Sequence, residues 1–231
     1  MSRYKMHRAF FKEIDMYNKI LLVIALSLFT LGQSFAAEAA PINDLKTPIN
    51  HLEPVEFITI ITTDMLKVVK ANKTGIDEDP KQLLKIVDEK IMSYVANKII
   101  ARKVMGLKWK TATVKQKEDF TTEFTKYLKR FYSRAFLSYD KQTLVYNPKP
   151  KMKGSKIATV YTSMVESGKP DIQIDYKLYL RKDGGWVMID IVVEGISLVI
   201  NNQRQYGGQI KREGLDSVIV KLTYNNSKEF K

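Results

Sequence analysis

The stretch "VMIDIVVEGISLVINNQRQY", Val187 to Tyr206, decides the fold because it joins an apolar strand to further apolar sequence with little polar sequence between them. An ordinary half-exposed strand would alternate apolar and polar residues and end sooner. The chain turns at Glu194-Gly195, and Ser197 is then a helix start signal ahead of Leu198 to Ile200. We therefore predict a buried strand followed directly by a helix, with a wide apolar sheet face that other elements must cover.

The residues just before this strand predict a hairpin. "KDGG" separates Asp171 to Lys182 from Trp186 to Glu194, and its Asp183-Gly184 is typical of a two-residue type I′ turn. With these two residues at the turn centre, one face is purely apolar and pairs Leu180 with Val187, Leu178 with Ile189, Tyr176 with Ile191, and Ile174 with Val193. The other face pairs Arg181 with Trp186, Lys177 with Asp190, and Gln173 with Glu194.

Helical spacing dominates the first half of the chain. Val55 to Lys73 and Lys81 to Met105 carry apolar residues at intervals that predict helices, although "ITIITT" within the first would also suit a strand. A capping box marks a third helix, because Thr113 is a typical N-cap residue and Gln116 follows three residues later. The apolar stripe of this helix is either core or one wall of a ligand cavity. It consists of Phe120, Phe124, Leu128, Phe131 and Ala135.

The pattern changes to period two from Gln142 onward. Strands are predicted near Leu144 to Lys151 and Lys156 to Ser167, ahead of the hairpin. "QYGGQI" is interpreted as a helix break, and "GLDSVIVKL" as a last helix with Asp216 at its N-cap. The order of elements predicts an α+β fold, in which N-terminal helices pack on a twisted antiparallel sheet and short helices close the domain.

Residues 1–36 are typical of a secretory signal peptide. Five Lys and Arg residues precede or border an apolar segment from Ile20 to Gly32, and the small residues Ser34 and Ala36 precede the expected cleavage site. The apolar segment is too short to span a bilayer, so an uncleaved anchor is the less favoured alternative. We expect residues 37–53 to form a linker and residues 54–231 a single domain.

The chain is basic, with a net charge of +13. The leader holds five basic and two acidic residues, so +10 remains after cleavage. In an exported protein this charge suits anionic lipid surfaces or acidic proteins rather than nucleic acid. Four cations in the second half of the capped helix, in "KYLKRFYSRAF", are either solvated residues or a docking surface. They are Lys126, Lys129, Arg130 and Arg134.

The residues available for catalysis are few. There is no cysteine, which excludes disulfides and thiol chemistry, and His7 and His51 are the only histidines, which leaves little for a metal site or a catalytic triad. Asp190 is most simply an ion-pair partner of Lys177. We predict no catalytic residue, no metal and no cofactor; the alternative is an exported enzyme that uses Asp190 or Asp175 as a base.

Two motifs resemble those of the MlaC, or toluene-tolerance, family. "GLKWKTATVKQKEDFTTEFTKYLKRFYSRAF" is similar to a family segment with a Trp, an A-T, a Gln and F-x-x-x-F, and "DGGWVMIDIVVEGISLVINN" is similar to D-G-x-W-x-x-x-D-x-x-x-E-G-x-S-L-V. The chain departs from the family pattern N-Y-R-x-Q-F after Ile200, where it has Asn202, Gln203 and Arg204 in place of Y-R-x. Any role of that Tyr or Arg in the family is therefore not transferred to this chain.

The resemblance implies a periplasmic phospholipid carrier with a nuclear transport factor 2-like cone and an apolar lipid pocket. Its cargo would be a diacyl phospholipid. Its partners would be an outer-membrane lipoprotein complex and an inner-membrane ABC transporter with an MCE-domain subunit, and lipid transfer between them would maintain outer-membrane asymmetry. A monomer is expected.

The expected wall of the lipid pocket combines the apolar hairpin face, the capped helix and the segment after the last strand. It consists of Phe120, Phe124, Leu128, Phe131, Ile174, Tyr176, Leu178, Ile189, Ile191, Val193, Ile196 and Val199.

Overall fold

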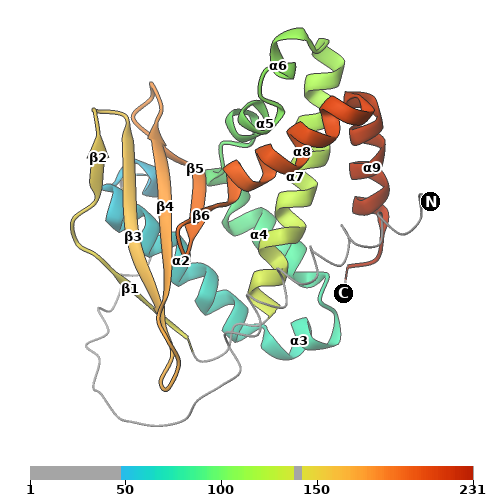
Figure 1. Cartoon of the computed structure of the whole chain (residues 1–231). Helices are drawn as coiled ribbons and strands as arrows, with labels where there is room; N and C mark the ends of the chain where they lie inside the picture. The colour runs from blue at the N-terminus through green and yellow to red at the C-terminus, as the bar shows by residue number, and fades with distance from the viewer. Residues whose placement is uncertain (1–47, 138–141, 231) are drawn as a thin grey trace.

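A six-stranded antiparallel sheet lies beside a layer of helices (Figure 1). The structure is a computed structural model and describes residues 48–137 and 142–230. The predicted α+β class is confirmed. The elements are η2 (Ile49–His51), α2 (Pro54–Ala71), α3 (Lys73–Glu78), α4 (Gln82–Lys90), η3 (Met92–Tyr94), α5 (Asn97–Met105), α6 (Lys108–Thr111), α7 (Val114–Leu137), β1 (Thr143–Tyr146), β2 (Lys151–Lys153), β3 (Ile157–Val165), β4 (Ile172–Leu180), β5 (Trp186–Val193), β6 (Ile196–Ser197), α8 (Leu198–Glu213) and α9 (Leu215–Ser227).

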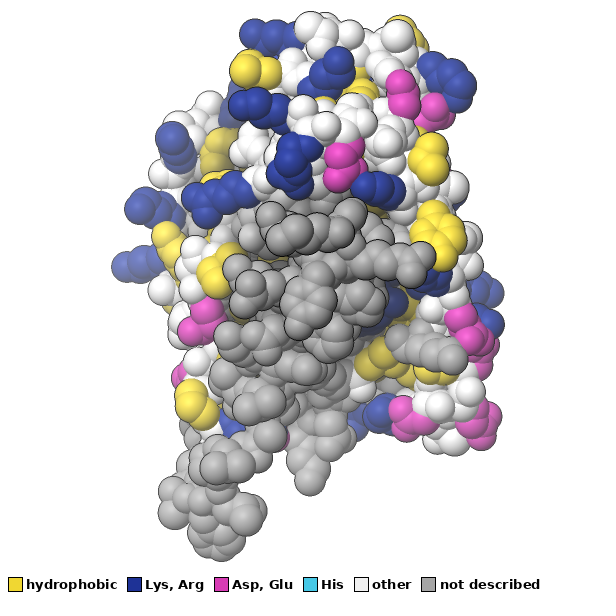
Figure 2. All heavy atoms as spheres, turned by 45° about the vertical axis from the view of Figure 1, so that its right-hand side comes forward, with side chains coloured by type: hydrophobic (Ala, Val, Ile, Leu, Met, Phe, Trp, Pro, Cys, Tyr) yellow, Lys and Arg dark blue, Asp and Glu magenta, His cyan; other side chains and the backbone are white. Residues whose placement is uncertain are grey.

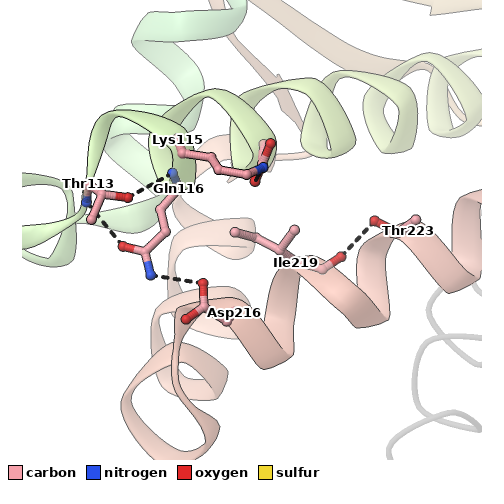
Figure 3. Close-up of polar contacts among 7 residues, drawn as sticks. Thr113, Lys115, Gln116, Asp216, Ile219 and Thr223 are labelled. Atoms are coloured by element: carbon pink, nitrogen blue, oxygen red, sulfur yellow. Dashed lines mark hydrogen bonds and ion pairs between the residues drawn. The ribbon is translucent and has the colours of Figure 1, made fainter.

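The predicted capping box begins α7. Thr113 Oγ1 accepts a hydrogen bond from the Gln116 N–H at 3.1 Å, and Gln116 Oε1 accepts one from the Thr113 N–H at 3.1 Å (Figure 3). Gln116 Nε2 also donates to Asp216 Oδ1 at 2.8 Å, which links α7 to α9. The prediction that Asp216 is the N-cap of α9 is wrong. Gly214 occupies that position with φ 85°, and Asp216 lies in the first turn of the helix.

The region from Lys81 to Met105 does not form the continuous helix that its spacing predicts. It divides into α4, η3 and α5 because the chain between the last two reaches the sheet: Val95 forms a parallel bridge with Met188, and the Ala96 N–H donates to the Met188 carbonyl at 2.9 Å. A contact with a residue 93 positions later cannot be seen in local spacing. The helix predicted over Val55 to Lys73 is confirmed as α2.

The sheet has the strand order β1-β3-β4-β5-β6, and β2 pairs with the other part of β3. The strand predicted over Leu144 to Lys151 is wrong as one element, because Asn147 to Pro150 separates β1 from β2. Asn147 Oδ1 accepts the Lys149 N–H at 3.0 Å, a turn that side chains of this type favour over a continuing strand. The strands predicted for β3, β4 and β5 are confirmed to within a few residues.

The β4–β5 hairpin has a different turn and a partly different register from those predicted. Arg181 pairs with Gly185 through an N–H to carbonyl bond of 3.0 Å, so the loop holds the three residues Lys182 to Gly184, and Gly184 has φ 84°. Such a loop is a common alternative to the type I′ turn. The loop therefore takes one more residue from the β4 side than the predicted turn does. A β-bulge after Met188 adds one residue to β5, so the predicted register returns beyond the bulge.

This bulge separates correct from incorrect pairs. The predicted pairs of Ile174 with Val193, Tyr176 with Ile191 and Lys177 with Asp190 are confirmed. Closer to the turn, Leu178 pairs with Met188, Tyr179 with Val187 and Leu180 with Trp186, so the predicted partners of Leu178, Leu180 and Arg181 are wrong. Met188 instead of Ile189 therefore lies opposite Leu178 and shares its face.

Helix α8 follows β6 directly, as the opening stretch predicts. Ser197 is its N-cap and accepts the Ile200 N–H on its side-chain oxygen at 3.0 Å. The predicted break at Gly207-Gly208 is wrong, since α8 continues through both glycines to Glu213. A Cβ at Gly207 would lie 3.9 Å from the Val104 carbonyl, an ordinary van der Waals distance, so α8 packs on α5 at this point.

The helical layer has an aromatic core centred on α7. Phe120 and Phe124 stack at 5.5 Å between ring centroids, and both meet the edge of Tyr206 from α8, at 6.5 and 5.6 Å. Burial of such rings gives each several kcal/mol at roughly 25 cal/mol per Å². Within the described residues, no helix combines the length and apolar character needed to cross a membrane.

Candidate functional site

An apolar cavity lies between the sheet and the helices that pack on it. Its volume is about 90 Å³. Contributions come from α2, the α4–α5 region, the C-terminal part of α7 and three strands. The lining residues are Ile61, Thr62, Met65, Leu66, Ile91, Val95, Ile100, Tyr132, Phe136, Leu144, Tyr176, Met188, Asp190 and Ile191.

Hydroxyl groups supply most of the polar atoms around the cavity. Thr62 Oγ1 donates to the Ile58 carbonyl at 2.6 Å and lies 2.7 Å from the Tyr146 hydroxyl. Burial raises the pKa of Tyr176, and the nearby Tyr146 and Tyr132 raise it further. Burial and the charge of Asp190 raise the pKa of Tyr132. Both phenols therefore stay neutral at physiological pH, and they can donate a hydrogen bond without adding charge to an apolar space.

Asp190 is the single acidic residue in the lining, and three groups already bind its carboxylate. Ser197 Oγ donates at 2.6 Å and Lys177 Nζ at 3.4 Å to Oδ2, while the Val199 N–H donates to Oδ1 at 3.1 Å. Partial burial lowers the pKa of Lys103, while the charge of Asp190 raises it and so opposes the effect of burial. A buried carboxylate with these partners serves to join β5 to α8 and is poorly placed to accept a proton from a bound molecule.

The structure distributes the expected wall residues over several regions, and only two of these residues line the cavity. Tyr176 and Ile191 line the cavity. Leu178 is fully buried, and Ile174 packs against the same core at its edge. The remaining members are the α7 residues Phe120, Phe124 and Leu128, buried in the helical layer; Phe131, half-buried beside Tyr127 and Tyr132; Ile189 and Val199, buried near the β5–α8 junction; Val193, half-buried; and Ile196, which is 57% exposed.

Sequence reasoning missed most of the helical side of the cavity, although signals for part of it were present. Ile61 and Met65 belong to the apolar stripe of α2, and Ile91 and Val95 belong to the spacing that follows. Tyr132 was missed because the apolar stripe predicted for α7 includes its neighbour Phe131 and not Tyr132. Met188 could not be found without the bulge that brings it onto this face.

These features place the chain in the class of α+β domains that enclose an apolar cavity between helices and an antiparallel sheet. A profile of the MlaC protein family matches residues 60–224. The chain belongs to this family, which confirms the resemblance of its motifs.

Two individual proteins illustrate the similarity. The intermembrane phospholipid transport system binding protein MlaC of Haemophilus influenzae is 22% identical over 184 residues, which cover 79% of this chain and 86% of that protein. The solved structure of a phospholipid-binding protein from Ralstonia solanacearum in complex with a phospholipid superposes with a TM-score of 0.66 at 23% identity. The match covers 74% of this chain and 94% of the Ralstonia chain, and it shows the same fold.

Proposed function

We propose that this protein is a periplasmic phospholipid carrier. The observation that carries the proposal is the apolar cavity between the helices and the sheet in a chain of the MlaC family. Both relatives described above are named for phospholipid, which supports a diacyl phospholipid as cargo. The protein binds and releases its cargo without covalent chemistry and without a cofactor or metal.

The physical requirement for a carrier is the cost of exposing acyl chains to water. Two chains of a diacyl lipid hold about 30 methylenes, and at roughly 0.8 kcal/mol each their exposure costs on the order of 25 kcal/mol. Free lipid between two membranes is therefore negligible, and a protein interior must replace the bilayer during transfer. A charged headgroup left in water at the mouth avoids the cost of burying it.

The cavity must widen to hold such a cargo. Sites for drug-sized ligands are about 300–1,000 Å³, and two acyl chains are larger than most drugs, whereas this cavity is about 90 Å³. Widening would separate the helices from the sheet and add neighbouring apolar residues to the wall. On this proposal the wall of the widened cavity gains Ile174, Leu178 and Val193 beside Tyr176 and Ile191. The other expected wall residues, on α7 and around the β5–α8 junction, then lie deeper in the cavity or at its mouth.

The carrier would move lipid between an outer-membrane lipoprotein complex and an inner-membrane MCE-type ABC transporter, and so maintain outer-membrane lipid asymmetry. Export of a monomer would follow cleavage of residues 1–36, so N-terminal sequencing of the exported protein should begin at Ala37 or within a residue or two. Retention of Ile20 to Gly32 in that protein would contradict this part of the proposal.

Vesicle-to-vesicle transfer tests the proposal. Donor vesicles that carry a fluorescent phospholipid should lose it to acceptor vesicles at a rate proportional to the concentration of added protein. Transfer no faster than the spontaneous rate would contradict a carrier. Turnover of an added substrate that is abolished by Asp190→Asn or Asp175→Asn would favour an enzyme instead.

A further inference from the structure

The corner that joins α5 to α7 through α6 carries an unbalanced positive charge. Residues 97–117 contain seven Lys and Arg residues and no Asp or Glu. Among the described residues, ion pairs within this range are found for Lys115 alone, with Asp119 at 2.7 Å. In Figure 2 dark blue side chains outnumber magenta ones over the upper part of the molecule, where α5, α6 and the start of α7 lie in Figure 1 together with the end of α8 and the start of α9.

Two apolar side chains project into solvent at the same corner. Gly106 ends α5 with φ 58° and ψ −130°, a conformation that L side chains avoid, and the reversal leaves Leu107 83% exposed. Val114, at the start of α7, is 70% exposed. Trp109 lies between them on α6, half-buried, with Lys117 Nζ 5.9 Å from its ring centroid. We call residues 102–114, which hold four of these seven cations, the basic tip.

The four cations in the second half of α7 offer a contrast, since each of them already has a contact within the protein. Lys126 pairs with Glu123 at 2.7 Å, and Lys129 pairs with Asp88 at 3.3 Å. Arg130 and Arg134 lie over the ring of Phe230, at 5.3 and 5.1 Å, and Arg130 also donates to the Lys228 carbonyl at 3.0 Å. The tip therefore differs from this part of α7, because most of its cations have no ion-pair partner among the described residues and can bind an external anionic group.

We propose that the basic tip docks on the surface of an anionic phospholipid bilayer. An exposed Leu and a Trp flanked by Lys and Arg are the groups that enter the headgroup region and pair with lipid phosphates. The tip is one short segment between α5 and α7, which suits shallow insertion better than the roughly 800 Å² that each partner buries in a typical protein interface. Ile100 of α5 lines the cavity, so the helix that leads into the tip also forms part of the cavity wall.

The docking goes beyond the proposed function and can fail separately from it. The test uses protein produced from the full-length gene, with its N-terminus and its lipid content measured by mass spectrometry. Binding is measured by cosedimentation with phosphatidylethanolamine vesicles that contain phosphatidylglycerol, and with phosphatidylcholine vesicles as the neutral comparison. Trp109 is the reporter of insertion, because the only other tryptophan, Trp186, is buried.

The chain supplies a matched control. Lys108-Trp109-Lys110 in the tip resembles Lys151-Met152-Lys153 of β2, where two exposed lysines also flank a large apolar side chain. At about 1 kcal/mol per cation, or roughly fivefold each, Lys108→Gln/Lys110→Gln should weaken binding to anionic vesicles about 25-fold at low salt. Lys151→Gln/Lys153→Gln should leave it unchanged.

Leu107→Ser tests the insertion of the apolar side chain separately from the attraction of the cations to anionic lipid. It should weaken the binding that persists at raised salt and reduce the blue shift of Trp109 emission on vesicle addition. The proposal is overturned if the two lysine pairs matter equally, if anionic vesicles bind no better than neutral ones, or if the protein binds only to membrane protein complexes and not to vesicles. Unchanged lipid content in the variants keeps these outcomes independent of cargo binding.

Discussion

The main-chain N–H of Val199 donates a hydrogen bond to Asp190 Oδ1 at 3.1 Å, which places a strand carboxylate at the N-terminus of α8. Ser197 Oγ donates to the other oxygen of Asp190 at 2.6 Å and accepts the Ile200 N–H at 3.0 Å. The carboxylate thus stabilises the partial positive charge and the free N–H groups at the helix start. The opening stretch turns from strand to helix in so few residues because these contacts hold the junction.

Asp190→Asn should weaken this junction without abolishing lipid binding. The substitution removes the charge that Lys177 and the helix N-terminus share, so we expect a loss of about 2 kcal/mol in the free energy of unfolding, measured by urea denaturation. Asp171→Asn is the control, because Asp171 is exposed. Equal stability of the two variants would show that the junction does not depend on this carboxylate.

Glu123 should make acid stability depend on the α7–α9 contact. Its carboxylate accepts from Lys126 Nζ at 2.7 Å and from Asn226 Nδ2 at 2.8 Å. Burial acts to raise the pKa of Glu123, but these hydrogen bonds and the charge of Lys126 outweigh it and lower the pKa below its ordinary value of 4.5. A lowered folded-state pKa contributes stability above the unfolded value and loses it as pH falls through the folded value.

Glu123→Gln should therefore destabilise the protein by about 1–2 kcal/mol near neutral pH, and the difference from wild type should shrink as pH falls below 4.5. Urea unfolding at several pH values measures it. Glu118→Gln, at an exposed position five residues earlier on α7, should show no such dependence. A constant difference across the range would mean that Glu123 acts by packing alone.

Asn202 should be replaceable with a gain in stability. It is buried, and its Nδ2 donates to the Leu198 carbonyl at 2.8 Å, but its Oδ1 has no hydrogen-bond partner among the described residues. An unpaired buried acceptor costs about 1–3 kcal/mol. Asn202→Leu keeps the branching at Cγ and removes the unpaired acceptor, and we expect the midpoint of thermal unfolding to rise by a few degrees. Asn225→Leu, on the exposed side of α9, should leave it unchanged; a fall for Asn202→Leu would show that this acceptor is satisfied in solution.

The cavity wall can be tested by changing its polarity and its size separately. Ile191→Asp places an unpartnered carboxylate on the wall, so it should lower both stability and lipid content. Leu66→Phe fills space in the cavity and should reduce bound lipid with a smaller effect on stability. Val145→Asp, at an exposed site on β1, should change neither. Full lipid content in a folded Ile191→Asp protein would exclude Ile191 from the wall.

Local signals predicted most of the elements, and long-range contacts account for the errors between α4 and α5 and in the β4–β5 hairpin. Thr113 and Gln116 lie in one helical turn, so their capping box could be predicted from spacing alone. The division of α4 from α5 depends on Val95 reaching Met188, and the face that Met188 occupies depends on a three-residue loop and a bulge. The hairpin side of the cavity, Tyr176 and Ile191, was predicted because the register is regular there; Tyr132 and Phe136 were missed because their contact with the sheet depends on how α7 packs.

Quantitative mass spectrometry of organic extracts from the purified exported protein tests the central claim most directly. Extraction after removal of loosely bound lipid by gel filtration should recover diacyl phospholipid in a stoichiometric ratio to protein, and Ile191→Asp should reduce that ratio while Val145→Asp does not. Repeated absence of phospholipid from folded protein made in a phospholipid-containing host would contradict the account.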